Sequence, residues 1–298
     1  MSSRRSGFTL VEMMVAVVLV AAVVAVAFAL LVQNQRVSRS QVAHAGLQDN
    51  IRAGALIVAN ELREIGYDSI PPSAGLGAVS TVNPDLLVML PGRLEYKAMR
   101  GIGFSCAPPG PSEIRLQRAT VLGTRRPEAG DSITAFVEGN PDTGTDDAWV
   151  HAAVAGVANG LCADGSPALV LAVSSADPAG AAAPPRMVVG GPVRFFEVME
   201  LRYYRSGGKS WLGSRSVSAG GVIEPMLGPL ADSTSAGRGL TFAYLDRTGA
   251  FTSVPNEVRE ISWTLHGVTD GPVRTRGRAP AVDSLTLSTS VALRNTLR

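Results

Sequence analysis

The stretch Gly7-Phe8-Thr9-Leu10-Val11-Glu12, followed by MMVAVVLVAAVVAVAFALLV at residues 13–32, decides the fold. Residues 1–7 ahead of it are polar and positively charged, whereas residues 13–32 are apolar and carry no charge. A helix rises about 1.5 Å per residue, so this run spans about 30 Å, the thickness of the hydrocarbon core of a bilayer. The sequence therefore predicts that residues 13–32 cross a membrane as a helix.

Two common kinds of N-terminal segment explain this stretch only in part. The apolar run is long for a secretory signal peptide, and it ends at Gln33-Asn34-Gln35-Arg36 without a small-x-small cleavage site. A plain anchor fits the hydropathy, with Arg4 and Arg5 keeping the N-terminus in the cytoplasm. It gives no role to Glu12, a carboxylate at the edge of hydrocarbon. In that alternative, the Glu12 side chain simply reaches the lipid headgroups.

The residues from Gly7 to Glu12 resemble the type III signal sequence of type IV prepilins and type II secretion pseudopilins. The resemblance implies that a prepilin peptidase cleaves between Gly7 and Phe8 on the cytoplasmic side of the membrane. It also implies that the same enzyme N-methylates Phe8. Cleavage creates an α-amine one helical turn from Glu12, and a carboxylate in hydrocarbon needs a cationic partner. We therefore expect Glu12 to pair with the terminal amine of a neighbouring subunit during assembly.

The helix is predicted to continue beyond the membrane, over residues 8–66. Apolar residues recur at steps of three and four positions, and Gly66 ahead of Pro71 and Pro72 is a plausible end. This second part is expected to pack its apolar stripe on a sheet. The predicted organisation is a leader at residues 1–7, a helix at residues 8–66 and a β-rich head at residues 67–298. The apolar positions are Leu47, Ile51, Ala55, Val58, Leu62 and Ile65.

The remainder of the chain has the short alternating runs and Gly/Pro-rich loops of an antiparallel sheet. Ser206-Gly207-Gly208 and the residues 246–249 are typical hairpin turns. The predicted fold class is α+β and pilin-like, with a long helix packed on an antiparallel sheet. Strands are expected at residues 85–90, 114–122, 132–137, 168–173, 198–205, 211–215, 240–244, 261–265 and 285–293.

The two cysteines, Cys106 and Cys162, lie downstream of the apolar run and allow a single intramolecular pairing. A disulfide is expected if this part of the chain is exported, and two buried free thiols are the alternative. Closing a loop of this length contributes at most about 4 kcal/mol in the chain-entropy model.

No assembled catalytic or cofactor site is visible in the sequence, so we expect a protein that is not an enzyme and has no cofactor and no bound metal. The histidines, His44, His151 and His266, lack metal-ligand spacing. Gly207-Gly208-Lys209-Ser210 imitates the end of a phosphate-binding loop, but Tyr203 stands where the first glycine belongs.

Two charged loops are weaker candidates for binding sites. Carboxylates cluster at Asp142, Asp146 and Asp147, which could bind calcium, although a solvated loop is the simpler interpretation. Arg274, Arg276 and Arg278 form a basic cluster that could bind an anionic partner. Nucleic acid is not the expected partner, because the net charge is only +2 and no basic stripe is present.

The residues 61–67 resemble the helix end of PilW-type minor pilins, and the residues 239–246 and 291–295 resemble the C-terminal ends of PilW-type minor pilins and J-type pseudopilins. The resemblance implies a minor pilin of a type IV pilus, with a type II secretion pseudopilin as the alternative. A tip adhesin or DNA-capturing minor pilin is a further alternative. The implied partners are the prepilin peptidase, other pilin subunits and, before assembly, inner-membrane lipid. The implied location is the inner membrane with an extracytoplasmic head, and then a filament at the cell surface.

Overall fold

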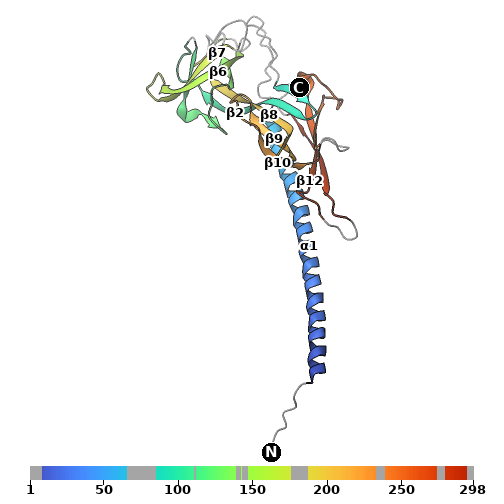
Figure 1. Ribbon diagram of the computed structural model, residues 1–298. Coiled ribbons are helices and arrows are strands. Elements are labelled where there is room, and N and C mark those ends of the chain that lie inside the picture. Colours follow the sequence, from blue (N-terminus) through green and yellow to red (C-terminus); the bar gives the residue numbers. More distant parts are fainter. Residues whose placement is uncertain are drawn as a thin grey trace, which may run out of the picture. The chain divides into compact units, whose positions relative to one another are not determined.

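The computed structural model describes residues 9–65, 85–110, 112–138, 142, 147–175, 187–232, 239–273 and 279–293. Within these residues a long helix, α1 (Leu10–Arg63), is followed by the strands of an antiparallel sheet (Figure 1). The predicted α+β architecture is confirmed. The chain divides into two compact units, one of residues 1–49 and 268–284, the other of residues 50–267 and 285–298.

The first unit contains the membrane-length part of α1. Its most apolar stretch is long and apolar enough to cross a membrane, and none of it is buried. The unit also contains residues 268–284, where the Thr269 and Asp283 backbones are joined by a 2.8 Å hydrogen bond. The side chains of His44 and Asp283 approach to 3.4 Å. Because none of the most apolar stretch of α1 is buried, the surface of that stretch is open to lipid or to another helix.

The second unit contains the end of α1, and here one face of the helix is buried. Ile51, Val58, Leu62 and Ile65 are at most 1% exposed, at steps that place them on one side. Gly54 on the same face meets Leu227 of β10 (Glu224–Leu230) so closely that a Cβ would lie 2.3 Å from a methyl group of that leucine. The amphipathic pattern thus packs this part of the helix on the sheet, as the sequence predicts.

The strands form a single antiparallel sheet in the described residues. Its main path runs β11-β12-β10-β9-β8-β5-β6-β7-β3, while β2 pairs with β1, β4 and β8, and β13 pairs with β12. The strands not yet given are β1 (Leu86–Leu90), β2 (Arg93–Phe104), β3 (Glu113–Gln117), β4 (Leu122–Gly123), β5 (Ser132–Val137), β6 (Ala148–Leu161), β7 (Pro167–Ser175), β8 (Pro192–Ser206), β9 (Lys209–Ser216), β11 (Leu240–Leu245), β12 (Glu260–Val268) and β13 (Ser284–Ala292).

Strand β8 is shared by two parts of the sheet. One edge pairs with β2 from Arg93↔Arg202 to Phe104↔Pro192. The other edge pairs first with β5 and then, further along, with β9. A bridge between Ser105 and Leu116 connects the end of β2 to β3, so β2, β8, β5, β6, β7 and β3 form a closed ring of pairings.

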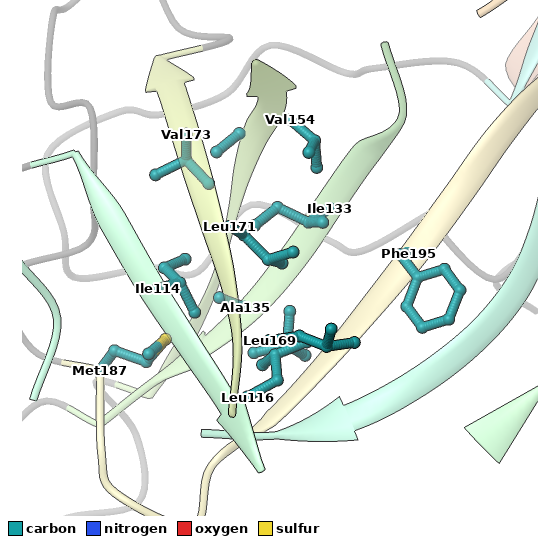
Figure 2. Packing of buried hydrophobic residues seen from close by; sticks show 12 residues of the cluster. Ile114, Leu116, Ile133, Ala135, Val154, Leu169, Leu171, Val173, Met187 and Phe195 are labelled. Carbon is teal, nitrogen blue, oxygen red and sulfur yellow. The ribbon is translucent and has the colours of Figure 1, made fainter. Parts of the chain in front are cut away.

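A buried apolar cluster is built by five strands of this ring (Figure 2). Ile114 and Leu116 of β3, Leu171 of β7, and Val193 and Phe195 of β8 are completely buried. Their alternation along each strand follows from the two-residue period of β structure. Cys106, just after β2, is joined to Cys162, just after β6, by a disulfide with a Cα–Cα distance of 5.3 Å.

Several strands differ from the predicted ones. The run 114–122 is not one strand, because β3 ends at Gln117 and a 3-10 turn, η1 (Arg118–Thr120), separates it from β4. Thr120 Oγ1 donates to the Gln117 carbonyl at 2.9 Å, which closes that turn. Strands β2, β6 and β10 were not predicted. The helix ends at Arg63 with a turn at Glu64 and Ile65, and Gly66 lies outside the described residues.

Candidate functional site

The start of α1 is closed by a reciprocal pair of side chains, Thr9 and Glu12. The Thr9 backbone N–H and hydroxyl both donate to Glu12 Oε2 at 3.2 Å, and the Glu12 N–H donates to Thr9 Oγ1 at 3.3 Å. The Thr9 carbonyl accepts the first helical hydrogen bond, from Met13 at 3.2 Å. This is a capping box, which satisfies N–H groups that the first turn leaves without partners. This cap was not predicted, although its local signal, the Thr-x-x-Glu spacing, is present in the sequence.

The geometry leaves half of the Glu12 carboxylate available. Both Thr9 donors reach Oε2, and among the described residues no hydrogen bond reaches Oε1. The carboxylate also lies in the first turn, where the helix dipole favours negative charge. Glu12 can therefore cap its own helix and accept an external cation at the same time.

The apolar surface beyond Glu12 is continuous. Large side chains from Leu10 to Leu31 are more than half exposed, and the helix has neither Pro nor Gly within residues 13–32. A helix of this kind is straight and stiff, since the common causes of kinks are absent. The helix therefore has a long apolar surface, and the first polar side chains follow Val32.

A buried ion network joins the other end of α1 to the sheet. Arg100 of β2 donates to Glu197 of β8 at 2.7 Å and to Glu61 of α1 at 3.2 Å. Tyr96 also donates to Glu61, at 3.1 Å. Arg125 lies 3.3 Å from the same Glu197 oxygen and binds both oxygens of Asp131, at 2.6 and 2.8 Å. The network ties the helix to β2, β8 and the loop before β5.

The environment shifts the pKa values of this network. Burial by itself raises the pKa of Glu197, but hydrogen bonds from Ser216 and Arg100 and the charge of Arg125 together bring that pKa below its ordinary value. Burial, followed by the neighbouring charge of Glu61, raises the pKa of the Tyr96 hydroxyl well above its usual range. Glu197 is therefore held as a carboxylate and Tyr96 as a neutral donor. No local sequence pattern predicts this network, because its members come from separate segments of the chain.

The remaining predicted residues fall in different places. Gly7, Phe8 and the arginine cluster Arg274, Arg276 and Arg278 lie outside the described residues, as do residues 143–146 of the acidic loop. In the part of the chain that the structure describes, no group of His, Cys, Asp and Glu side chains is placed to hold a metal.

The histidines and the glycine-rich turn have ordinary neighbours. His151 Nδ1 lies 3.4 Å from the Thr134 hydroxyl, and His266 Nδ1 lies 2.8 Å from that of Thr286. Gly207 and Gly208 have positive φ values of 60° and 76° and form the tight turn between β8 and β9. The turn is the predicted hairpin, because only glycine adopts both conformations without strain.

Comparison with known proteins agrees with the N-terminal geometry. Residues 2–28 match the family described as the prokaryotic N-terminal methylation motif. No curated protein and no solved structure matches the chain. The motif, the exposed apolar helix and the antiparallel sheet that follows it define a type IV pilin-like protein, in which the motif implies processing by a prepilin peptidase and assembly with other pilins.

Proposed function

We propose that this chain is a minor pilin, a non-enzymatic subunit that enters a type IV pilus through its apolar helix. The observation that carries the proposal is the methylation motif at residues 2–28, placed directly on an unburied helix of membrane length. Before assembly, the chain is a single-pass inner-membrane protein with its N-terminus in the cytoplasm and its sheet outside. A type II secretion pseudopilus is the alternative filament, since the motif serves both systems.

Glu12 is the proposed assembly residue. It accepts from Thr9 through Oε2, and no described residue donates a hydrogen bond to Oε1. The methylated amine of a neighbouring Phe8 is a cation of suitable size for that oxygen. In a medium of low dielectric constant such a pair is far stronger than in water, so it fixes the axial position of one subunit against the next.

Processing is tested by mass spectrometry of the mature protein. We expect a chain that begins at N-methylated Phe8 in cells that contain the peptidase. A mature chain that retains Met1 in those cells would exclude the proposed processing.

Two variants separate the proposed pairing from capping. Glu12→Gln keeps an acceptor for Thr9 but removes the charge, whereas Thr9→Val keeps the charge and removes the cap. We expect Glu12→Gln to be cleaved and methylated yet largely absent from sheared filaments, with Thr9→Val incorporated normally. The opposite result, incorporation of Glu12→Gln and loss of Thr9→Val, would assign Glu12 to capping alone.

The filament system is tested by purification. We expect the chain to co-purify with pili sheared from the cell surface and its loss to reduce piliation. A loss of protein export with normal piliation would assign it to a type II secretion pseudopilus instead.

A further inference from the structure

Strand β13 is an edge strand of the sheet. It pairs with β12, and hydrogen bonds between side chains fix the register: Thr264 with Ser288, and His266 with Thr286, each at 2.8 Å. In the described residues no other strand pairs with β13. Its second edge is therefore open in that part of the chain.

The outward backbone groups of β13 belong to its even-numbered residues. Leu293 donates to the Arg259 carbonyl and Thr269 to that of Asp283, both at 2.8 Å, so odd-numbered residues make the hydrogen bonds between the two strands. Successive backbone groups in a strand point to opposite edges. The N–H and C=O groups of Thr286, Ser288 and Ser290 accordingly point away from β12, and no hydrogen bond from a described residue reaches them.

The opposite edge of the same sheet is covered. Phe242 of β11 donates to the Pro91 carbonyl at 2.7 Å, and the Tyr244 carbonyl accepts from Thr252 at 3.0 Å. These bonds use the groups of β11 that point away from β12. Among the described residues, the outer edge of β11 thus has hydrogen-bond partners, whereas the outer edge of β13 does not.

Strand β13 also lacks the usual protection of an exposed edge. Its sequence, SLTLSTSVA, has no charge, no Pro and no Gly over nine residues. Natural sheets guard long edges with lysine, proline, bulges or a covering element, because an open edge pairs with other chains. An edge of this length, without these features in its own sequence, is available to pair with a further strand.

We propose that β13 is a docking edge for an extended segment of a different filament subunit, which adds a strand to the sheet. The inference rests on the proposed function, since it names a partner within the filament. The chemistry of the edge defines the segment. The exposed alternate residues of β13 are four hydroxyl residues and one alanine: Ser284, Thr286, Ser288, Ser290 and Ala292. The residues between them, including Leu285, Leu287 and Val291, are half-buried or buried. The matching strand is uncharged and alternates apolar residues with small or hydroxyl residues.

A second copy of this chain is a poorer occupant. Two β13 edges in antiparallel pairing would make an isologous contact, which closes on itself as a dimer. A filament grows through heterologous contacts, in which one surface meets a different surface of the next subunit. The expected partner strand therefore comes from another kind of subunit.

The test uses the full chain in cells that assemble the filament, with a photo-reactive benzophenone side chain in place of Ser290. Ser288→Pro then removes an outward N–H without touching a bond to β12, and Ser288→Ala is its control, since both lose the hydroxyl contact to Thr264. We expect a photoproduct with a different subunit in the Ser288→Ala background. In Ser288→Pro it should fall at least about fivefold, because a hydrogen bond is lost and the ring blocks the edge.

Ser288→Lys is a second variant, which keeps the N–H but adds a charge to the edge and should weaken the product in the same way. Retention of the Cys106–Cys162 disulfide and an unchanged melting temperature show that each variant is folded. Three results would each overturn the docking edge and leave the proposed function intact. These are equal photoproduct yields in the Pro and Ala variants, a photoproduct that joins only two copies of this chain, and the absence of a photoproduct from chains that do enter filaments. If the parent chain never enters filaments, the proposed function fails first.

Discussion

Arg100 is the residue on which the join between helix and sheet depends. Its guanidinium lies between Glu61 and Glu197, and its side chain and that of Glu197 are each only 10% exposed. Removing one member of such a group leaves the others as buried charges without compensation. The network as a whole therefore contributes little net stability, whereas removing any one of its members lowers the free energy of unfolding considerably.

We expect Arg100→Met to lower the free energy of unfolding by about 3 kcal/mol. The measurement is chemical denaturation of the full chain in detergent. Arg100→Met combined with Glu197→Gln should recover part of the loss, because the stranded carboxylate is then gone. Additive effects of the two changes would show that the charges are not coupled.

The lowered pKa of Glu197 predicts a loss of stability in acid. A carboxyl with a folded pKa below its unfolded value of 4.5 stabilises the protein above that value, and the contribution disappears as the pH falls through the folded pKa. We expect the difference in unfolding free energy between the unaltered chain and Glu197→Gln to be constant near neutral pH and to narrow below about pH 4.5. A difference that is independent of pH would contradict the assignment.

For individual residues, the sequence predicts the N-terminal motif better than it predicts the contacts that side chains make. The order Gly7 to Glu12 is local and was readable, and it led to Glu12 as the assembly residue, which stays a prediction. The bond from Thr9 to Glu12 is local too and follows from the Thr-x-x-Glu spacing. Arg100 and Glu197 are 97 positions apart, and no local pattern records which distant charge a buried arginine meets.

Among the elements, α1 offers a matched pair of glycines for measuring how tightly it packs. A Cβ at Gly54 would lie 2.3 to 2.9 Å from three atoms of the buried Leu227, whereas one at Gly46 would meet nothing within 4 Å. We expect Gly54→Ala to lower the melting temperature of the full chain, because the clash outweighs the gain in helix propensity. Gly46→Ala should raise the melting temperature slightly, because the better helix propensity of alanine adds about 0.5–1 kcal/mol to the free energy of unfolding. Equal effects at both sites would mean that the helix does not pack closely on β10.

The disulfide stabilises the ring of strands by closing a long loop. Cys106 and Cys162 are 56 positions apart, and chain entropy gives about 4 kcal/mol for a loop of that size. We therefore expect the Cys106→Ser, Cys162→Ser double variant to unfold at a markedly lower denaturant concentration. Non-reducing peptide mapping of the unaltered chain should recover the joined peptides, and reduction alone should reproduce the loss. A midpoint that both treatments leave unchanged would count against the bridge.

Most strands with clean alternation were predictable, and the missed ones break that pattern for identifiable reasons. Strand β2 carries Lys97 and Arg100, which are both buried, and Arg100 pairs with Glu197. Two such charged residues make the sequence of β2 more polar than is usual for a central strand. Strand β6 is rich in Ala and Gly, and β10 contains two prolines and shifts register twice against β9. In each case contacts from distant segments override weak local propensity.

For the molecule as a whole, the burial along α1 predicts where the chain can be cut. Its residues up to Leu31 are exposed, whereas Ile51, Val58 and Leu62 are buried. A chain that begins at Asn34 should be soluble without detergent and melt like the full protein. One that begins after Ile65 should aggregate, because it lacks the helical face that covers apolar side chains of the sheet. Size-exclusion chromatography and melting curves distinguish the two, and a stable monomer from the shorter chain would contradict this view of the core.

The sharing of β8 has a mechanical consequence. A pull on α1 passes through Glu61 to Arg100 and so to β2, which is paired with β8 along its whole length. Many hydrogen bonds between β2 and β8 would have to break together before the two strands could slide past each other. A force on the end of α1 is therefore spread along the whole β2–β8 pairing. Within the unit of residues 50–267 and 285–298, the end of α1 should therefore stay joined to the sheet under load for as long as β2 and β8 stay paired.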